Sequence, residues 1–229
     1  MKLEKVKEAL KLNQRAYDRI RSIGCMGRTE QELLSEVKAV YGEENGEPLP
    51  CLYDLLSGER GGAISGEATD RRVRRGDTVI FDLLPCVEGN WCDTTRTFFM
   101  GEPAEHLKAA YEAVLAAIRA GEAVLKPGMS GDGIFRAVSG ALVQNGCAPL
   151  PHHAGHAVGG DNMEEPDFVR GCEGTLKEGM VVTLEPGVYF PGENGIRVEN
   201  NYLITESGCE LLFEYPTDLT FFILEENEQ

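Results

Sequence analysis

The sequence carries one carboxylate pattern twice. A glycine begins a short apolar run that ends in an acid, Asp82, and the same design returns in the second half of the chain, where the run ends in Glu185. Turn residues follow each run and lead to a second acid: Asp93 lies 11 positions beyond Asp82, and Glu199 lies 14 positions beyond Glu185. Such steps are typical of a β-hairpin that sets its two carboxylates roughly opposite each other.

Four carboxylates in one buried place need a counter-charge. If the two hairpins meet across an internal pseudo-twofold axis, the four acids converge, and like charges that close cannot all stay ionised. Divalent cations are the simplest remedy, and oxygen-rich ligation with one imidazole suits manganese, cobalt, iron or zinc. The alternative is four ordinary solvated acids among the 38 of the chain. A repeated position is hard to obtain from composition alone, so we favour the metal site.

Three of the four histidines lie within five residues, at His152, His153 and His156. Glycines flank this cluster just upstream of the second acid run, and small residues let a backbone approach a ligand closely. One imidazole from the cluster would complete a set of five ligands, and we favour His156 for that role over a packed core histidine. The fourth, His106, begins an acidic helix and is expected to be an ordinary surface residue.

Both halves of the chain show the same order of elements. Apolar residues at helical spacing predict a helix from Leu3 to Ile20, and a capping box at Thr29–Glu32 predicts the start of a second. The pair recurs as an apolar stripe over Leu107–Ile118 and a helix capped by Ser130. Each half therefore reads helix, helix, strands, with the acid hairpin last. Further strand pairs are expected around residues 57–65 and 152–160.

Composition excludes several classes of protein. The chain has 229 residues and a formal net charge of −16, which argues against non-specific binding to nucleic acid or to an anionic membrane. Seven scattered cysteines without a CxxC pair indicate reduced thiols rather than a disulfide framework. No apolar run approaches the length of a membrane span, and the charged start has no secretory apolar region. We therefore expect a cytoplasmic protein.

The ordered set of acids and histidine resembles the five ligands of the pita-bread metallopeptidases. This is the family of methionine aminopeptidase, Xaa-Pro dipeptidase (prolidase) and Xaa-Pro aminopeptidase. The resemblance covers nearly the whole chain and implies an α+β pita-bread fold, in which two pseudo-twofold halves place helices over a curved, mostly antiparallel sheet. It also implies one catalytic domain over residues 1–229, without the amino-terminal domain common in the Xaa-Pro branch. The motifs are Asp93-Thr-Thr-Arg-Thr97, Gly155-His156, Glu164-Glu165-Pro166, Leu184-Glu185-Pro-Gly-Val188 and Gly195-Ile-Arg-Val-Glu199.

The resemblance also implies two divalent metal ions. In the family, the equivalents of Asp93 and Glu199 bridge both ions. Asp82 would then bind one ion, while His156 and Glu185 would bind the other. The metals expected are manganese, cobalt, iron or zinc.

The Xaa-Pro branch fits better than methionine aminopeptidase. The loop Ser57–Gly61 resembles that branch, and His152 matches a substrate-binding histidine four residues before the metal histidine. Arg197 stands where the branch has arginine, and the resemblance implies that it contacts the substrate. We expect hydrolysis of short peptides with proline in second position by a hydroxide on the metals, with Glu185 as the proton shuttle. His152, helped by His153, would hold the substrate carbonyl or carboxylate.

Two departures from the family pattern keep alternatives open. Met163 stands where the family usually has a histidine seven residues after the metal histidine, and Ser65 replaces another. Those imidazoles are thought to steady the scissile amide, so their loss removes donors to the transition state. The fold also hosts creatine amidinohydrolase, a sulfonium-compound lyase and catalytically silent binding modules, and each class stays an alternative. A homodimer, common in the family, is an expectation of the same kind.

Overall fold

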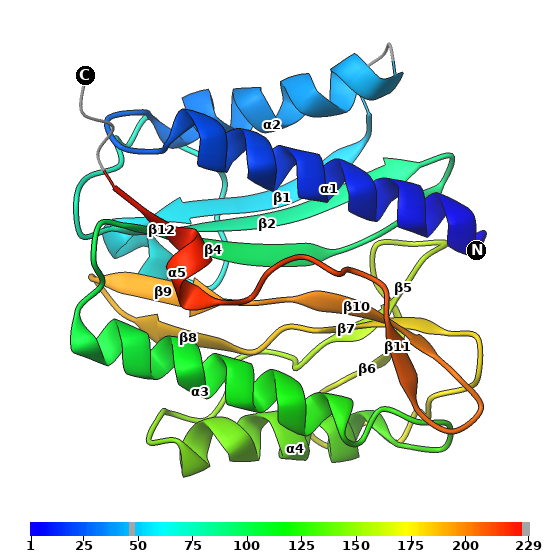
Figure 1. Ribbon diagram of the computed structural model, residues 1–229. Coiled ribbons are helices and arrows are strands. Elements are labelled where there is room, and N and C mark those ends of the chain that lie inside the picture. The colour runs from blue at the N-terminus through cyan, green and yellow to red at the C-terminus, as the bar shows by residue number, and fades with distance from the viewer. Residues whose placement is uncertain (46–48, 226–229) are drawn as a thin grey trace.

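The computed structural model describes residues 1–45 and 49–225, and its helices come in two pairs. In Figure 1 the first pair lies above the strands and the second pair lies below them. A 3-10 turn, Gly58–Gly62, and a short helix, α5 (Leu219–Phe222), complete the helical elements of the described chain. The two pairs are α1 (Leu3–Ile23) with α2 (Glu30–Asn45), and α3 (Glu105–Glu122) with α4 (Gly131–Gln144).

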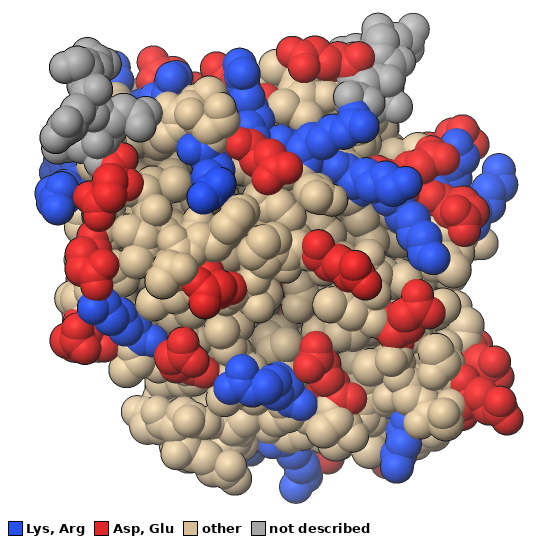
Figure 2. Space-filling model, in the orientation of Figure 1, with Lys and Arg blue, Asp and Glu red and all other residues tan. Residues whose placement is uncertain are grey.

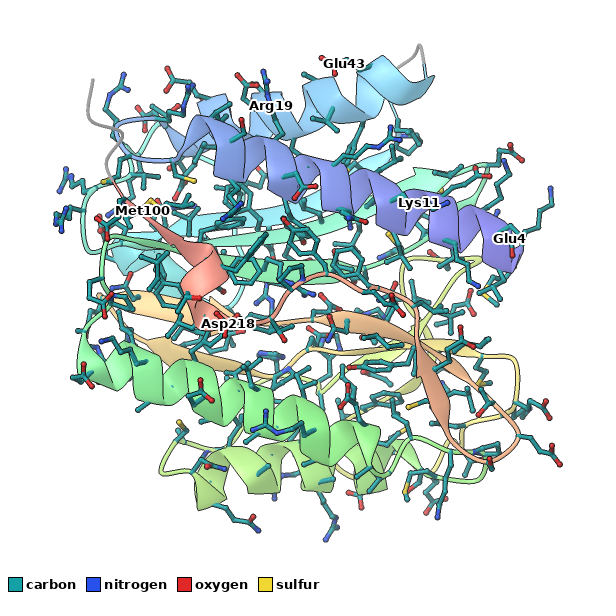
Figure 3. All side chains as sticks on the ribbon, in the orientation of Figure 1. Glu4, Lys11, Arg19, Glu43, Met100 and Asp218 are labelled. Atoms are coloured by element: carbon teal, nitrogen blue, oxygen red, sulfur yellow. The ribbon has the colours of Figure 1, made fainter. Side chains whose placement is uncertain are left out.

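The first helix shows why the sequence predicts these elements well. Val6, Leu10, Tyr17 and Ile20, which recur at helical spacing, are all buried against the strands. Charged residues follow the outer side of the helix, as Glu4, Lys11 and Arg19 show in Figure 3. A helix with one apolar stripe is fixed in orientation by burying that stripe.

Both expected helix caps are present. At the start of α2, Thr29 Oγ1 accepts from the Glu32 N–H at 3.0 Å, and Glu32 Oε2 accepts from the Thr29 N–H at 2.7 Å. This reciprocal arrangement is the predicted capping box. At α4, the Ser130 hydroxyl accepts from the Gly133 N–H at 3.2 Å.

The strands form two five-stranded sheets and a separate hairpin. The first sheet has the order β1-β2-β4-β12, with β3 paired to β2, and the second has the order β11-β10-β7-β5-β6. Pairing is antiparallel except between β4 and β12. The first-sheet strands are β1 (Cys51–Ser57), β2 (Thr78–Val87), β3 (Asn90–Trp91), β4 (Thr94–Met100) and β12 (Ile223–Leu224). The others are β5 (His156–Val158), β6 (Glu164–Asp167), β7 (Val181–Leu184), β10 (Asn200–Ile204) and β11 (Cys209–Leu211), with β8 (Gly187–Phe190) and β9 (Asn194–Arg197) as the hairpin.

The repeat in the sequence is a repeat in the topology. Each helix pair is followed by three adjacent antiparallel strands, β1-β2-β4 in the first half and β5-β7-β10 in the second. On the first hairpin Asp82 pairs with Thr95, and on the second Leu184 pairs with Asn200. The acids therefore lie close to opposite positions of neighbouring strands, as the spacing predicted. The second copy has three more positions between its acids, and there it forms the separate β8–β9 hairpin, whereas the first copy continues β2 and returns through the short strand β3.

One segment, Asn194–Glu199, joins the two halves. The Thr97 hydroxyl donates to the Arg197 carbonyl at 2.8 Å, and the Glu199 N–H donates to the Thr95 carbonyl at 3.0 Å. Near the other end of the segment, Gly195 packs directly on Gly61. A Cβ added to Gly195 would overlap the Gly61 carbonyl. The second acid hairpin is thereby held along β4 of the first half.

The expected strand pair around residues 57–65 is only half right. β1 leads into this region, but residues 58–62 form the 3-10 turn and no strand returns before β2. Glu30, fully buried, holds the region instead, because its carboxylate accepts from the Ser57 and Thr69 N–H groups at 2.9 Å each. In the second half the expected pair is present as β5 and β6.

The surface shows no clustering of one sign of charge on the face seen in Figure 2, where acidic and basic residues are interspersed. All seven cysteines are free. None of the helices within residues 1–45 and 49–225 is long and apolar enough to cross a membrane.

Candidate metal centre

The five predicted ligands lie on the central strands or directly beside their ends. Asp82 is in the middle of β2, Asp93 directly precedes β4, and His156 begins β5. Glu185 directly follows β7, and Glu199 directly precedes β10. All five are buried, with exposed fractions between 1% for Glu199 and 9% for Asp82.

The structure brings these side chains together. His156 Nε2 lies 3.5 Å from Oδ2 of Asp93 and 3.6 Å from Oε1 of Glu185. Ligand atoms of Asp93, His156 and Glu199 all lie within 4.8 Å of one another. Asp82 adjoins Asp93, and the two carboxyl groups influence each other's pKa. Separations of this size between ligand atoms are suited to one shared cluster of cations.

The carboxylates lack the partners that buried acids require. One oxygen of each of the four, Oδ1 of Asp82 and Asp93 and Oε1 of Glu185 and Glu199, is buried without a hydrogen bond. Such groups are costly to bury uncompensated. Burial, and then the neighbouring acids, raise the pKa of Asp93 and of Glu199 well above its ordinary value. Four oxygen ligands beside one imidazole fit divalent metal ions, which would supply the missing positive charge.

The imidazole of His156 is already set in the orientation that a ligand needs. Its Nδ1 donates to the Ala157 carbonyl at 2.9 Å, so the lone pair is on Nε2, which faces Asp93 and Glu185. Its backbone N–H donates to the Thr183 hydroxyl at 3.1 Å. A backbone carbonyl therefore selects the tautomer.

Two polar residues that the sequence did not single out hold the acids. The Thr95 hydroxyl donates to Oε2 of Glu199 at 2.9 Å, and Oδ1 of Asn201 accepts from the Asp93 N–H at 3.2 Å. Each of these bonds crosses about 100 positions of sequence, between Thr95 and Glu199 and between Asp93 and Asn201. The signal available in the sequence was their place beside the acids in Asp93-Thr-Thr and Glu199-Asn-Asn.

Arg197 lies behind the carboxylates. It is 2% exposed, and its Nη2 donates to Oδ2 of Asp82 at 2.6 Å. Its Nη1 donates to the Tyr189 hydroxyl at 2.9 Å and to the Ile64 carbonyl at 2.8 Å. The guanidinium is thus fully engaged within the protein, and its predicted contact with substrate stays a prediction.

His152 is linked to this arginine through Tyr189. The ring donates from Nδ1 to the His153 carbonyl at 2.7 Å, so Nε2 accepts from the Tyr189 hydroxyl at 2.8 Å. Burial lowers the pKa of His152 to about 4, so the ring is neutral at pH 7. Both nitrogens therefore have partners inside the protein, and holding a substrate carbonyl would require one of them to be exchanged.

His153 lies between two carboxylates. Its Nδ1 is 3.0 Å from Oδ1 of Asp167, and its Nε2 is 3.2 Å from Oε1 of Glu185, off the line of a good hydrogen bond. Burial lowers the pKa of His153, but Glu185 and Asp167 outweigh it and raise the pKa to about 9. Burial likewise raises the pKa of Glu185, yet His153 outweighs it and the pKa falls to about 2. The two side chains form an ion pair.

The positions that depart from the family pattern bring no imidazole to the site. Met163 is 51% exposed, just before β6. The Ser65 hydroxyl donates to Oδ1 of Asp54 at 2.9 Å, and Oδ2 of Asp54 is 3.5 Å from Nη2 of Arg197. His106 is exposed, as predicted for a surface histidine, and its Nε2 lies 2.7 Å from Oε1 of Glu193.

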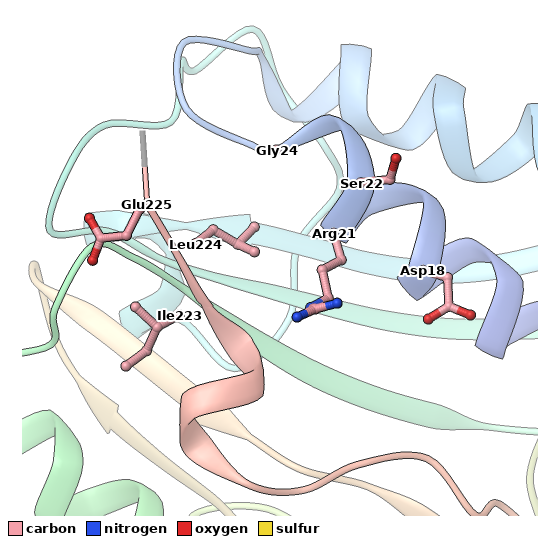
Figure 4. Close-up of a pocket in the computed structure, with 7 residues that line it drawn as sticks. All are labelled: Asp18, Arg21, Ser22, Gly24, Ile223, Leu224 and Glu225. Carbon is pink, nitrogen blue, oxygen red and sulfur yellow. The ribbon is translucent and has the colours of Figure 1, made fainter. Parts of the chain in front are cut away.

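A separate hollow of about 440 Å³ lies between the end of α1 and β12, as Figure 4 shows. Its charged side chains are already engaged: Oδ1 of Asp18 accepts from the Tyr215 hydroxyl at 2.8 Å, and Arg21 donates to the Phe221 carbonyl at 3.2 Å. Arg21 also lies over the Phe221 ring. This hollow has no group of converging ligands comparable to the metal centre.

Comparison with known proteins identifies the family and the relatives of this chain. The model of metallopeptidase family M24 matches residues 4–206. Among curated relatives, the Xaa-Pro dipeptidase of Pyrococcus furiosus is 34% identical over 195 residues, which are 84% of this chain and 56% of that protein. An uncharacterised peptidase of Bacillus subtilis is 30% identical over 215 residues, 93% of this chain and 61% of that protein. The chain therefore spans a little over half the length of these relatives.

Solved structures show the same architecture. The dipeptidase PepE of Mycobacterium ulcerans superposes with a TM-score of 0.91 at 28% identity, over 97% of this chain and 60% of that one. The prolidase of Pyrococcus furiosus superposes with a TM-score of 0.89 at 31% identity, over 93% of this chain and 64% of that one. The predicted pita-bread fold is thereby confirmed, as is the resemblance to the Xaa-Pro peptidases. The chain belongs to metallopeptidase family M24.

Proposed function

We propose that this protein hydrolyses short peptides, with proline in second position, at a centre of two divalent metal ions. The observation that carries the proposal is the group of four buried carboxylates, each with an unpartnered oxygen, around the lone pair of His156. The similarity to Xaa-Pro dipeptidase over 84% of this chain supports the substrate class. The ions would be manganese, cobalt, iron or zinc, given the mixed oxygen and nitrogen donors.

The ligands would divide between two ions. Asp93 and Glu199, whose ligand atoms lie within 4.8 Å of each other and of that of His156, would contact both ions. Asp82 would serve one, while His156 and Glu185 would serve the other, consistent with the 3.6 Å between their ligand atoms. When bound, the two ions would activate a water for attack on the scissile amide.

The residues of the chain would then handle the proton and the substrate. Glu185 would take the proton from the attacking water and pass it to the leaving nitrogen. Its lowered pKa keeps it ionised at neutral pH. His152 and His153 both lie near the Glu185 carboxylate and would contact the substrate carbonyl or carboxylate, with Arg197 acting through Tyr189.

A substrate panel tests the proposal. Purified protein, supplied separately with manganese, cobalt, iron and zinc, is assayed on Xaa-Pro dipeptides, a Met-Ala peptide and a non-peptide amide. We expect turnover of Xaa-Pro substrates with at least one metal, and none by Glu185→Gln, which keeps the side-chain volume but removes the base. Metal binding without turnover of any peptide would refute the proposal.

A second candidate function is an enzyme of this fold that acts on a different small substrate. The observation in its favour is that neither Met163, which is half exposed, nor Ser65, which is bonded to Asp54, offers a donor to the site. Turnover of a non-peptide amide in the same panel, with no activity on dipeptides, would support it. A silent binding module is disfavoured because all five ligand types are present and buried together.

The substitution Met163→His should increase the turnover of Xaa-Pro dipeptides. One well-placed donor to a developing oxyanion contributes on the order of a hundredfold in rate in other hydrolases, so restoring one should recover part of that factor. The measurement is kcat/KM on an Xaa-Pro dipeptide at saturating metal. Met163→Leu, similar in size but without a donor, should leave kcat/KM unchanged. A decrease with histidine would show that another group already occupies this role.

A further inference from the structure

The side chain of His153 lies between two carboxylates. It is 20% exposed and lies between Asp167 on β6 and Glu185 after β7. Asp167 pairs with His156 across the β5–β6 ladder, so the strand that carries the candidate ligand His156 also fixes Asp167. Both carboxylates that contact the ring therefore lie on or directly beside strands of the second sheet.

Glu185 depends on this ring more than the neighbouring acids do. Asp82 is oriented by Arg197 at 2.6 Å, and Glu199 is oriented by Thr95 at 2.9 Å. For Glu185, Oε1 lies 3.2 Å from Nε2 of His153, while Oε2 lies 4.0 Å from Nδ1 of His152. The approach of His153 is the shortest polar side-chain contact of the Glu185 carboxylate in the described structure.

Asp167 completes the arrangement from the other side. Its Oδ1 lies 3.0 Å from Nδ1 of His153 and so holds the plane of the ring. The carboxylates that bind metal ions are commonly held by outer polar partners, and such partners contribute to metal affinity. The contact of Nε2 with Glu185 follows from that orientation.

We propose that His153, oriented by Asp167, is a positioning residue that holds the Glu185 carboxylate at the metal centre. Without this ring, the nearest side-chain nitrogen to Oε1 of Glu185 would be Nε2 of His156, at 3.6 Å. No other side chain of the described residues would then fix the position of Oε1. Asp167 acts only through the ring. The proposal rests on the presence of the metal centre in the proposed function, but not on the identity of the substrate.

The affinity for Mn²⁺ tests this role without any assay of activity. Isothermal titration gives the Kd of each ion for the unmodified protein and for His153→Ala, His153→Gln and Asp167→Asn. Loss of an outer partner of a metal ligand typically costs 10–100-fold in affinity. We expect His153→Ala to weaken the binding of one of the two ions by about this factor and to leave the affinity for the other unchanged. His153→Gln, which keeps an N–H donor, should recover part of the loss. Thermal unfolding of each variant establishes that it is folded.

A double-mutant cycle tests the link to Asp167. Asp167→Asn should weaken the same ion, and it should have no further effect in a His153→Ala background, because contacting residues are not additive. His106→Gln, at an exposed histidine paired with Glu193, is the matched control and should change neither Kd. Equal costs of Asp167→Asn in both backgrounds would overturn the proposal, as would unchanged affinities in His153→Ala.

Kinetics separate positioning from substrate binding. A misplaced Glu185 should lower kcat at saturating metal with little change in KM. A rise in KM alone, with Mn²⁺ affinities unchanged, would limit His153 to the substrate contact of the proposed function and would overturn its positioning role. If the unmodified protein turns over no peptide, the proposed function fails, while the Mn²⁺ titrations still decide the role of His153.

Discussion

Replacement of Glu199 by alanine should remove both metal ions and abolish peptide hydrolysis. Glu199 is 1% exposed, and its ligand atom lies within 4.8 Å of those of Asp93 and His156, so it is placed to contact both ions. Asp82 lies on one side of the group, next to Arg197, so Asp82→Ala should spare the ion served by His156. Elemental analysis of the purified variants after dialysis against excess Mn²⁺ counts the ions.

The exposed acid Glu178 provides the control for this pair of variants, and Glu178→Ala should keep both ions. Thermal unfolding in chelator shows whether each protein is folded before metal is added. Equal loss of both ions in Asp82→Ala and Glu199→Ala would contradict this division of the ligands. Full retention of metal by Glu199→Ala would contradict the proposed centre itself.

Arg197→Met should destabilise the metal-free protein strongly. The guanidinium is 2% exposed and donates to Asp82, Tyr189 and the Ile64 carbonyl. Its removal leaves the buried Asp82 carboxylate without its cation, and breaking a buried pair in this way typically costs about 3–5 kcal/mol. Urea unfolding in the presence of chelator measures the free energy of unfolding.

Two further arginine variants give this measurement its controls. Arg197→Lys keeps the charge but lacks the planar guanidinium that reaches several acceptors. Its free energy of unfolding should therefore lie between those of Arg197→Met and the unmodified protein. Arg72→Met removes an arginine whose side chain is 63% exposed, and its free energy of unfolding should be nearly unchanged. Equal stability of Arg197→Met and the unmodified protein would mean that the pair with Asp82 contributes nothing in the absence of metal.

The sequence predicted the acids and the repeated halves because these are periodic or repeated features, and it predicted His156 from the cluster of histidines. The apolar run before Asp82 and the run before Glu185 each form part of a buried central strand, β2 and β7. Helix caps at Thr29 and Ser130 are also local and are found as expected. Local periodicity is the strongest signal that a single sequence offers.

Contacts between distant strands were beyond this kind of reasoning. Thr95, Tyr189 and Asp167 are ordinary polar residues whose roles arise only when β4, β8 and β6 meet the site. The prediction of a strand pair around residues 57–65 was only half right for the same reason. Buried Glu30, at the start of α2, holds that segment in a 3-10 turn. A partner supplied by tertiary packing leaves no local pattern.

The division of the ligands between the two halves bears on folding kinetics. Asp82 and Asp93 come from the first half, His156, Glu185 and Glu199 come from the second, and the segment Asn194–Glu199 joins them along β4. Such long-range pairing is costly in chain entropy and is completed late on the folding route. Ions bound at this junction would stabilise contacts that are absent from the transition state, so they would slow unfolding and leave the folding rate unchanged. Stopped-flow unfolding in urea with and without Mn²⁺ would show this effect on the lifetime of the native state.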